Sequence, residues 1–444
     1  MAPIPQTATV FAYQVGFGDC FLLRFDYSDG SRRHILIDFG TTGMPKDDAT
    51  ITMKRVARDI AERCGGALDI VVATHRHADH ISGFETKADK TGSGDIIAGL
   101  KPRRVIQPWT EAPDAPEDWT GPEGTDPATA FAARVQSLDG MHAVARAVVE
   151  RLDREGFDSH WPLAPRLRFI GEDNIKNLSA VKNLKSMAGE EPEDKANYLY
   201  VFHGCNLDLS AILPGVKVHV LGPPTLGQTQ TIKKQASKSA DEFWLRAPAM
   251  LALDADAGVA SARRSMLFPN LEREDMFRRS KMPAAMRWAA ERIDTAEAEQ
   301  LLGIVTKLDK AMNNTSLILL FEAGSKKLLF PGDAQLENWT YALQSEMADL
   351  LDDVDLYKVG HHGSLNATPK SMWDRFSKRG AAGKAGRLTS VMSTMEGKHG
   401  GKHGSPTEVP RRPLVEELKA NSNLVNTQDL AKGELFHEVI VDLR

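Results

Sequence analysis

Three histidines and one aspartate fall within six residues of the sequence, at His75, His77, Asp79 and His80. Neutral imidazole and carboxylate groups are ligands suited to first-row divalent cations. In an extended segment the side chains alternate between two sides, so His75 and His77 can point the same way and bind one ion. If the chain then turns into a helix near Asp79, Asp79 and His80 can face a neighbouring position. This one segment is therefore predicted to supply parts of two adjacent metal sites.

Further candidates lie at or after the ends of apolar runs elsewhere in the chain. Asp38 and Asp333 each end or follow a run that reads as a strand. A carboxylate can bridge two cations, although an aspartate after a strand is also a common turn residue. His361 and His362 are adjacent, so in an extended chain they face opposite ways and cannot easily bind the same ion. We assign His361 as a metal ligand and leave His362 to contact substrate or donate a proton, while the reverse assignment stays open.

The apolar pattern around these candidates predicts alternating strands and helices, and this alternation indicates a layered α/β architecture. Strands are expected at residues 8–16, 20–27, 34–38, 68–73, 104–107, 216–221, 316–321, 327–331, 354–359, 388–393 and 434–442. Helices are expected at 53–64, 336–348, 369–377 and 413–420.

Two stretches of different character interrupt this pattern. One starts with a loop rich in proline and glycine and continues as a long amphipathic helix, and the other reads as mostly helical. The expected organisation is a core first half at 1–107, an insertion at 108–215, a core strand at 216–225, a helical insertion at 226–311 and a core second half at 312–444.

Several motifs in this order resemble those of the metallo-β-lactamase fold superfamily. They are THRHADH at 74–80, VGFGDCFLL at 15–23, ILIDFG at 35–40, NNTSLILL at 313–320, LLFPGDA at 328–334 and LYKVGHHGS at 356–364. Their order and wording look most like the subgroup typified by the C-terminal domain of the competence protein ComEC. The resemblance covers roughly 8–107, 216–225 and 313–444, and the residues between these blocks are assigned to no family.

The resemblance implies a fold and a metal centre. The fold is an αββα sandwich, two mixed sheets flanked by helices, here carrying two largely helical insertions. Two divalent cations are expected, the first bound by His75, His77 and Asp333 and the second by Asp79, His80, Asp333 and His361. Asp38 orients the metal loop from behind the ligands.

One position departs from the wider superfamily, which has a third histidine just ahead of the strand at 316–321. This chain has Asn313 and Asn314 there, as the ComEC-like subgroup does. An amide oxygen or a water in place of an imidazole shifts the preference of the first site from zinc toward manganese. We expect zinc, with manganese as the alternative, and it stays open whether the first site is filled.

The resemblance also suggests residues that touch the substrate. His403 matches a loop histidine that precedes the last helix, although His399 is a nearby rival. Catalytic candidates are Asp79, His362, His403 and Asp38, and candidates for substrate binding are Asn313, Asn314, Ser364 and Lys402.

Two cations can activate a shared water as hydroxide and neutralise charge on phosphorus. This chemistry fits phosphodiester cleavage and lactone or β-lactam hydrolysis alike, so the metals alone do not name the substrate. The leading interpretation is a hydrolase that cleaves a phosphodiester, as a nuclease acting on DNA or RNA, and it rests on the ComEC-like resemblance, the missing third histidine and the basic residues between 375 and 412. A small-molecule hydrolase acting on a lactone, an ester or a phosphorylcholine-type substrate is the second hypothesis. A metal-stabilised sensor or partner subunit is the third.

Composition sets the remaining expectations. The 444 residues are 42% hydrophobic and 26% charged, with a net charge of −5 and only three cysteines, which read as reduced thiols. No apolar run approaches the length that spans a bilayer, and no signal peptide is recognised, so we expect a cytoplasmic protein without membrane contact. Nine basic residues between 375 and 412 could attract an anionic substrate such as nucleic acid, or form a solvated surface. The insertions could bind a protein partner or a second copy of the chain.

Overall fold

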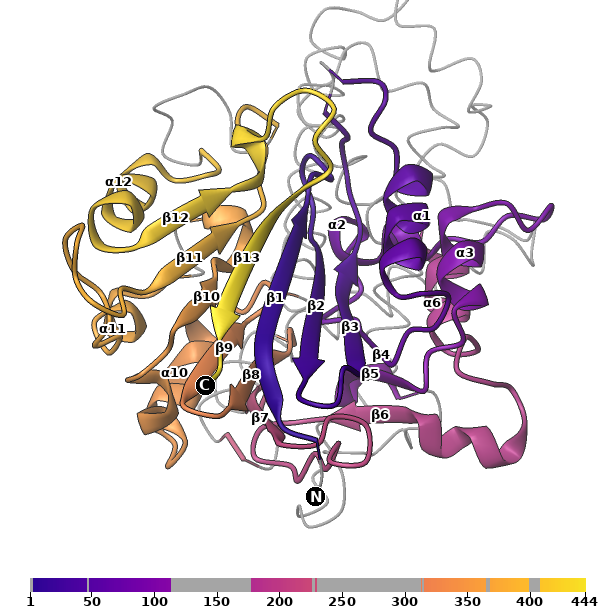
Figure 1. Cartoon of the computed structure of the whole chain (residues 1–444), viewed down its shortest axis with the longest axis horizontal. Helices are drawn as coiled ribbons and strands as arrows, with labels where there is room; N and C mark the ends of the chain where they lie inside the picture. Colours follow the sequence, from indigo (N-terminus) through magenta and orange to yellow (C-terminus); the bar gives the residue numbers. More distant parts are fainter. Residues whose placement is uncertain are drawn as a thin grey trace, which may run out of the picture.

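The computed structural model describes residues 3–45, 48–112, 177–225, 228–229, 313, 315–364, 368–398 and 408–444. In this part of the chain the fold is α/β, with two mixed β-sheets that pack face to face and helices on their outer faces (Figure 1). The α/β class expected from the sequence is confirmed, and the layers are compatible with an αββα sandwich.

The first sheet has seven strands in the order β13-β1-β2-β3-β4-β5-β6. They are β1 Pro5–Tyr13, β2 Cys20–Tyr27, β3 Arg32–Phe39, β4 Ile70–Val72, β5 Arg104–Pro108, β6 Tyr198–Val201 and β13 Phe436–Asp442. Strands β13, β1, β2 and β3 pair antiparallel, whereas β3 to β6 are parallel. Alternation along β1 turns Val10 toward the other sheet and Phe11 toward the helices, so both faces of this sheet are buried.

The second sheet has six strands in the order β12-β11-β10-β9-β8-β7. They are β7 Val216–Gly222, β8 Ile318–Ala323, β9 Lys326–Phe330, β10 Leu356–Lys358, β11 Thr389–Met392 and β12 Asn423–Asn426. Strands β9 to β12 run parallel, and β7 and β8 complete the sheet in antiparallel pairing.

Helices cover the outer face of each sheet. On the first sheet are α1 Met53–Arg63, α2 Ala78–Ile81, α3 Ser93–Gly99 and α6 Leu178–Leu184; on the second are α10 Leu336–Gln344, α11 Lys370–Trp373 and α12 Arg412–Asn421. Short 3₁₀ segments include η1 Ser82–Phe84, η2 Trp109–Glu111, η4 Pro192–Asn197, η6 Ala348–Leu351, η7 Gly360–Gly363 and η8 Thr427–Asp429. Helix α1 forms as the sequence predicts, because Thr52 caps its start and Val56, Ala57 and Ile60 pack into the core. No helix among the described residues is long and apolar enough to cross a membrane.

The first insertion was expected to end at residue 215, but the structure returns to the core earlier. Residues from 177 onward belong to the core, because α6 packs beside α3 and β6 extends the first sheet at β5. The short strand β12 is also missing from the sequence-based prediction, since its four residues are too few for a clear periodicity. The helices expected in the two insertions lie outside the described residues.

Candidate metal centre

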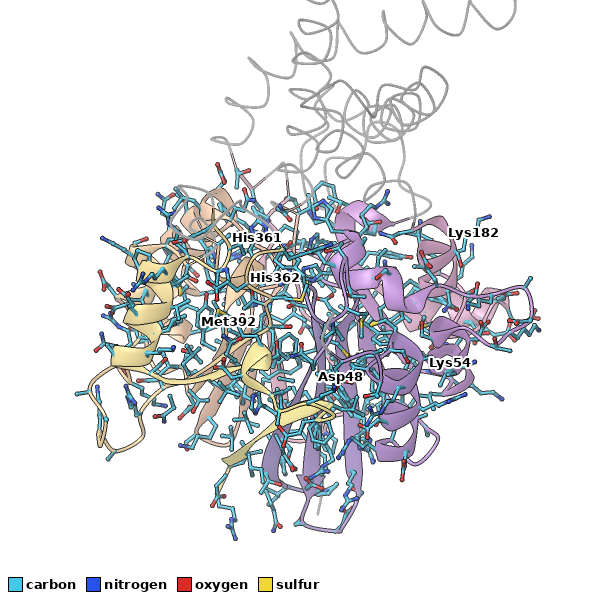
Figure 2. All side chains as sticks on the ribbon, turned by 90° about the horizontal axis from the view of Figure 1, so that it is seen from above. Asp48, Lys54, Lys182, His361, His362 and Met392 are labelled. Atoms are coloured by element: carbon cyan, nitrogen blue, oxygen red, sulfur yellow. The ribbon has the colours of Figure 1, made fainter. Side chains whose placement is uncertain are left out.

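The candidate residues converge at one edge, where the two sheets meet. Parallel strands deliver polar residues at their carboxyl ends, as open α/β sheets commonly do. The metal loop follows β4, Asp333 follows β9, and His361 and His362 follow β10. In Figure 2, His361 and His362 lie where the orange and yellow part of the ribbon meets the violet part.

The segment His75–His80 brings its candidate ligands together. His75 Nε2 lies 3.0 Å from His77 Nδ1, so both rings turn toward one point. His75, His77 and Asp79 form a buried group whose ligand atoms all lie within 4.8 Å of one another. The chain then enters α2 at Ala78, so Asp79 and His80 fall in a helical turn. Gly40 permits this arrangement, because a Cβ there would lie only 2.5 Å from the carbonyl oxygen of Ala78.

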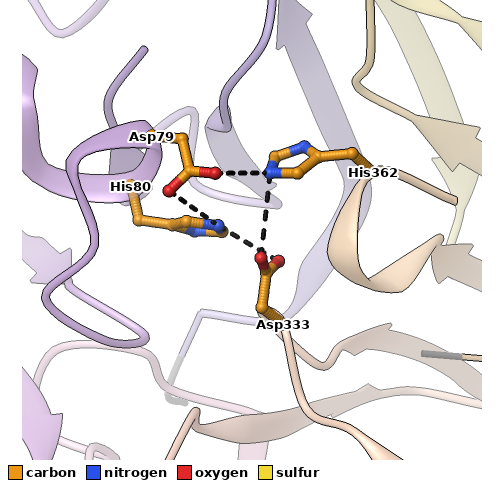
Figure 3. A group of neighbouring side chains, drawn as sticks. All are labelled: Asp79, His80, Asp333 and His362. Carbon is orange, nitrogen blue, oxygen red and sulfur yellow. Dashed lines mark hydrogen bonds and ion pairs between the residues drawn. The ribbon is translucent and has the colours of Figure 1, made fainter. Parts of the chain in front are cut away.

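A second buried group contains Asp79, His80, Asp333 and His362, again with ligand atoms within 4.8 Å (Figure 3). His362 Nε2 is 3.0 Å from Asp79 Oδ2 and 3.7 Å from Asp333 Oδ2, and His80 Nε2 is 3.1 Å from Asp333 Oδ1. Asp79 belongs to both groups, so the two candidate sites are adjacent.

Contacts behind the rings orient both histidines of the second group. Asp38 accepts hydrogen bonds of 2.7 Å from the Thr74 amide and the Thr74 hydroxyl, and its Oδ2 lies 2.7 Å from His80 Nδ1. His362 Nδ1 lies 3.1 Å from the carbonyl oxygen of Ser393. Because both partners only accept, the proton of each neutral imidazole sits on Nδ1 and the lone pair on Nε2 faces the group. Asp38 thus lies where the sequence-based interpretation expects it.

The division of roles between His361 and His362 differs from the expectation. His362, not His361, belongs to the four-residue group, and its side chain is fully buried, whereas the side chain of His361 is 28% exposed. The expectation assumed an extended chain. Instead His361 and His362 have φ values of 42° and 52°, so a left-handed turn rather than strand alternation sets their directions. His361 still lies at the rim, with Nε2 3.7 Å from Asp333 Oδ2.

Two residues of this region were missed. Asp19, just before β2, and Lys358, the last residue of β10, form a fully buried ion pair beneath the second group. Both stand in otherwise apolar runs, CFLL after Asp19 and LY before Lys358, and a charge in such a run is the signal that could have identified them.

The electrostatics of the region favour bound cations. Asp19, Asp38, Asp79 and Asp333 are four buried carboxylates, and Lys358 is the only buried ammonium that faces them among the described residues. With neutral histidines this would leave a net charge of minus three, which protonated histidines or bound cations must compensate in a buried site. Asp79 Oδ1 and Asp333 Oδ1 are also buried without a hydrogen bond from any described residue. The donor set therefore fits divalent metal ions.

The pKa values of His75 and His80 describe how each histidine would meet a metal ion. Burial by itself lowers the pKa of His80, but the carboxylates of Asp333, Asp38 and Asp19 raise it well above its usual value. Burial, together with the neighbouring His80 and His77, lowers the pKa of His75 well below the usual value. His75 is therefore neutral and ready to bind a metal, whereas His80 gives up a proton when a cation arrives.

The remaining candidates are only partly described. Asn314, Lys402, His403 and its rival His399 lie outside the described residues. Asn313 is buried, and its side-chain oxygen accepts no hydrogen bond from a described residue. The segment that follows Asn313 reaches the metal loop in space, since the amide of Leu317 donates to the carbonyl of Thr74. Ser364 follows directly after η7 and is buried.

Several basic residues between 375 and 412 form ion pairs with neighbouring carboxylates. Arg375, Lys378 and Arg379 form ion pairs with Asp352, Asp355 and Asp374, and Arg412 pairs with Glu416. Residues 375–387 also precede β11, whereas the metal centre lies past its other end, where Ser393 contacts His362. Four residues of strand separate the two positions, roughly 13 Å. This part of the stretch therefore does not line the centre.

No protein-family model matches the chain, and no curated protein sequence matches it.

Proposed function

We propose that the chain is a metal-dependent hydrolase of the metallo-β-lactamase type, related to the ComEC-like subgroup, that cleaves phosphodiesters. The main support is a pair of adjacent buried groups of candidate ligands that share Asp79. One group is His75, His77 and Asp79, and the other is Asp79, His80, Asp333 and His362. These residues would hold zinc or manganese, with Asp79 common to the two groups and Asp333 in the second.

Two divalent cations in these positions would activate a water molecule and neutralise charge on the substrate. The chain's own residues have separate tasks. Asp38 fixes the tautomer and direction of His80, and the Ser393 carbonyl does the same for His362. His361, partly exposed at the rim, is placed to donate a proton to the leaving group.

The choice of a phosphodiester, in DNA or RNA, rests on the ComEC-like motif order and on asparagine in place of a third histidine. The ion pairs of Arg375, Lys378 and Arg379 weaken one reason for a nucleic-acid substrate, and this supports the second candidate, hydrolysis of a small lactone, ester or phosphorylcholine-type substrate. A metal-stabilised sensor whose insertions bind a partner is the third hypothesis, and residues 113–176 and most of 226–311 in those insertions lie outside the described residues.

An activity screen with zinc and manganese supplied separately tests the proposal. The substrates are single-stranded DNA, duplex DNA, RNA, bis-p-nitrophenyl phosphate and a lactone, and Asp79→Asn is the matched inactive control. We expect a phosphodiester to be cleaved and the variant to lose this activity. Cleavage of the lactone alone would replace the phosphodiester by the small-molecule reading. No turnover in a metal-loaded protein would favour the sensor.

A further inference from the structure

We propose that the buried ion pair of Lys358 and Asp19 is a positioning device for the second cation site, and that neither residue binds the metal. This inference rests on the metal centre proposed above and assigns a task to two residues that the ligand groups leave unexplained.

Asp19 reaches the second site from behind. Its Oδ1 lies 3.5 Å from His362 Nδ1 and its Oδ2 lies 3.7 Å from His80 Nδ1. Its backbone amide donates to the carbonyl of Asp79 at 2.8 Å. Asp19 therefore touches three members of the group on the sides that face away from the shared point. Because the Nδ1 protons of His80 and His362 are directed to Asp38 and to the Ser393 carbonyl, Asp19 acts on the two rings through its charge and its packing, and on Asp79 through its backbone amide.

Lys358 links Asp19 to the fourth member. Its ammonium pairs with Asp19, donates to the carbonyl of Gly332 at 3.1 Å and lies 3.8 Å from Asp333 Oδ1. Gly332 has φ of 53° and forms the turn that presents Asp333. One side chain thus fastens the start of β2, the end of β10 and the turn after β9 at a common point.

The same geometry argues against a cation between Asp19, Asp38 and His80, although these three could form a ligand group. A cation there would stand beside the Lys358 ammonium. It would also compete for His80 Nδ1, whose proton is directed to Asp38. The lone pair on Nε2, which faces Asp333, is the one available for a metal.

Stability alone is a weak reason for such a pair. Replacing both members of a buried ion pair by uncharged groups is often neutral or stabilising, because desolvation costs about as much as the attraction gains. If the pair only stabilised the fold, removal of both charges together should leave metal affinity unchanged. If the pair positions the site, removal of both charges should weaken metal binding.

The test measures zinc and manganese binding by calorimetry on chelator-treated protein. It compares wild type, Asp19→Asn, Lys358→Met and the double variant. Lys326→Met is the matched control, because Lys326 pairs with Asp355 at 3.2 Å away from the centre. We expect each single variant to weaken one of two binding events by roughly 10–100-fold. The double variant should lose no more than the worse single variant, and the control should bind as wild type does. The visible spectrum of the cobalt-loaded protein should change in the three site variants and not in the control.

A folded double variant with wild-type affinity and cobalt spectrum would overturn the inference, and so would losses that add fully in the double variant. If a single variant fails to fold because one buried charge is left alone, the double variant still decides the question. Wild-type protein that binds no metal would overturn both the proposed function and this inference, whereas unchanged affinity in the variants overturns the inference alone.

Discussion

His362 Nε2 lies 3.0 Å from Asp79 Oδ2, although 283 positions separate the two residues in the chain. Asp79 lies in α2, which follows strand β4 of the first sheet, and His362 lies in η7, which follows strand β10 of the second. Their contact shows that the candidate centre exists only when the two sheets are packed together. Ligand binding and the packing of the sheets should therefore be coupled.

The two adjacent histidines should respond differently to substitution. We expect His362→Gln to weaken binding of one metal by about 100-fold or more, because loss of a ligand costs more than the roughly 10–100-fold lost with an outer-shell partner. His361→Gln should keep the metal and lower kcat by about 10²–10⁴-fold, the usual loss for a proton donor. Metal content and steady-state kinetics of both variants give the comparison. If His361→Gln loses the metal and His362→Gln keeps it, the assignment drawn from the structure is reversed.

The substitution Asp38→Asn should remove the charge of this side chain and keep the backbone conformation. Asp38 has φ of 55°, a region that asparagine tolerates well. The amide has a single acceptor oxygen for the three donors that now meet Asp38, so His80 loses its orientation. We expect about 10–100-fold weaker metal binding by calorimetry. Asp59→Asn on α1, which removes a carboxylate paired with Arg63, is the control and should bind metal normally.

Asn313→His should strengthen zinc binding at the first site. An imidazole nitrogen is a softer and better ligand for zinc than an amide oxygen or a water. Competition with a zinc chelator should show at least a tenfold gain in affinity, with a smaller change for manganese. Equal zinc affinity in the variant and in wild type would mean that Asn313 does not face this site.

His34 should make stability depend on pH without involving the metals. Burial, aided by Arg24, lowers the pKa of His34 to about 4 in the folded chain, below the value of about 6.5 expected on unfolding. Between these values the unfolded chain binds the proton and the folded one does not. The stability present at pH 7 is therefore lost as the pH falls from about 6.5 to 4, by about 3 kcal/mol. Urea unfolding of wild type and His34→Gln over this range should differ in slope, and parallel curves would contradict the prediction.

Removal of metal should destabilise the chain, because four buried carboxylates then keep only Lys358 and protonated His80 to compensate their charge. At a metal concentration of 100 times Kd, one site that binds only the folded chain contributes about 2.7 kcal/mol. Chelator treatment should lower Tm, and returning zinc should restore it. A Tm that chelator leaves unchanged would argue against bound metal, provided that the metal content of the untreated protein is measured.

Much of the centre follows from local sequence. The ligand types, their spacing at 75–80 and their positions after buried strands are readable because apolar alternation marks the strands and strand ends gather at one edge. The structure brings Asp38, His75, His77, His80 and Asp333 together as this reasoning expects, but Asp79 rather than Asp333 completes the group of His75 and His77.

Tertiary structure decided what local periodicity cannot encode. The direction of His361 and His362 depends on a left-handed turn after β10, which strand alternation does not describe. The task of Asp19 and Lys358 depends on a contact between residues more than 300 positions apart. Such long-range pairs are selected by the packing of the two sheets, and by the cost of burying a charge without its partner, so no single segment of the sequence reveals them.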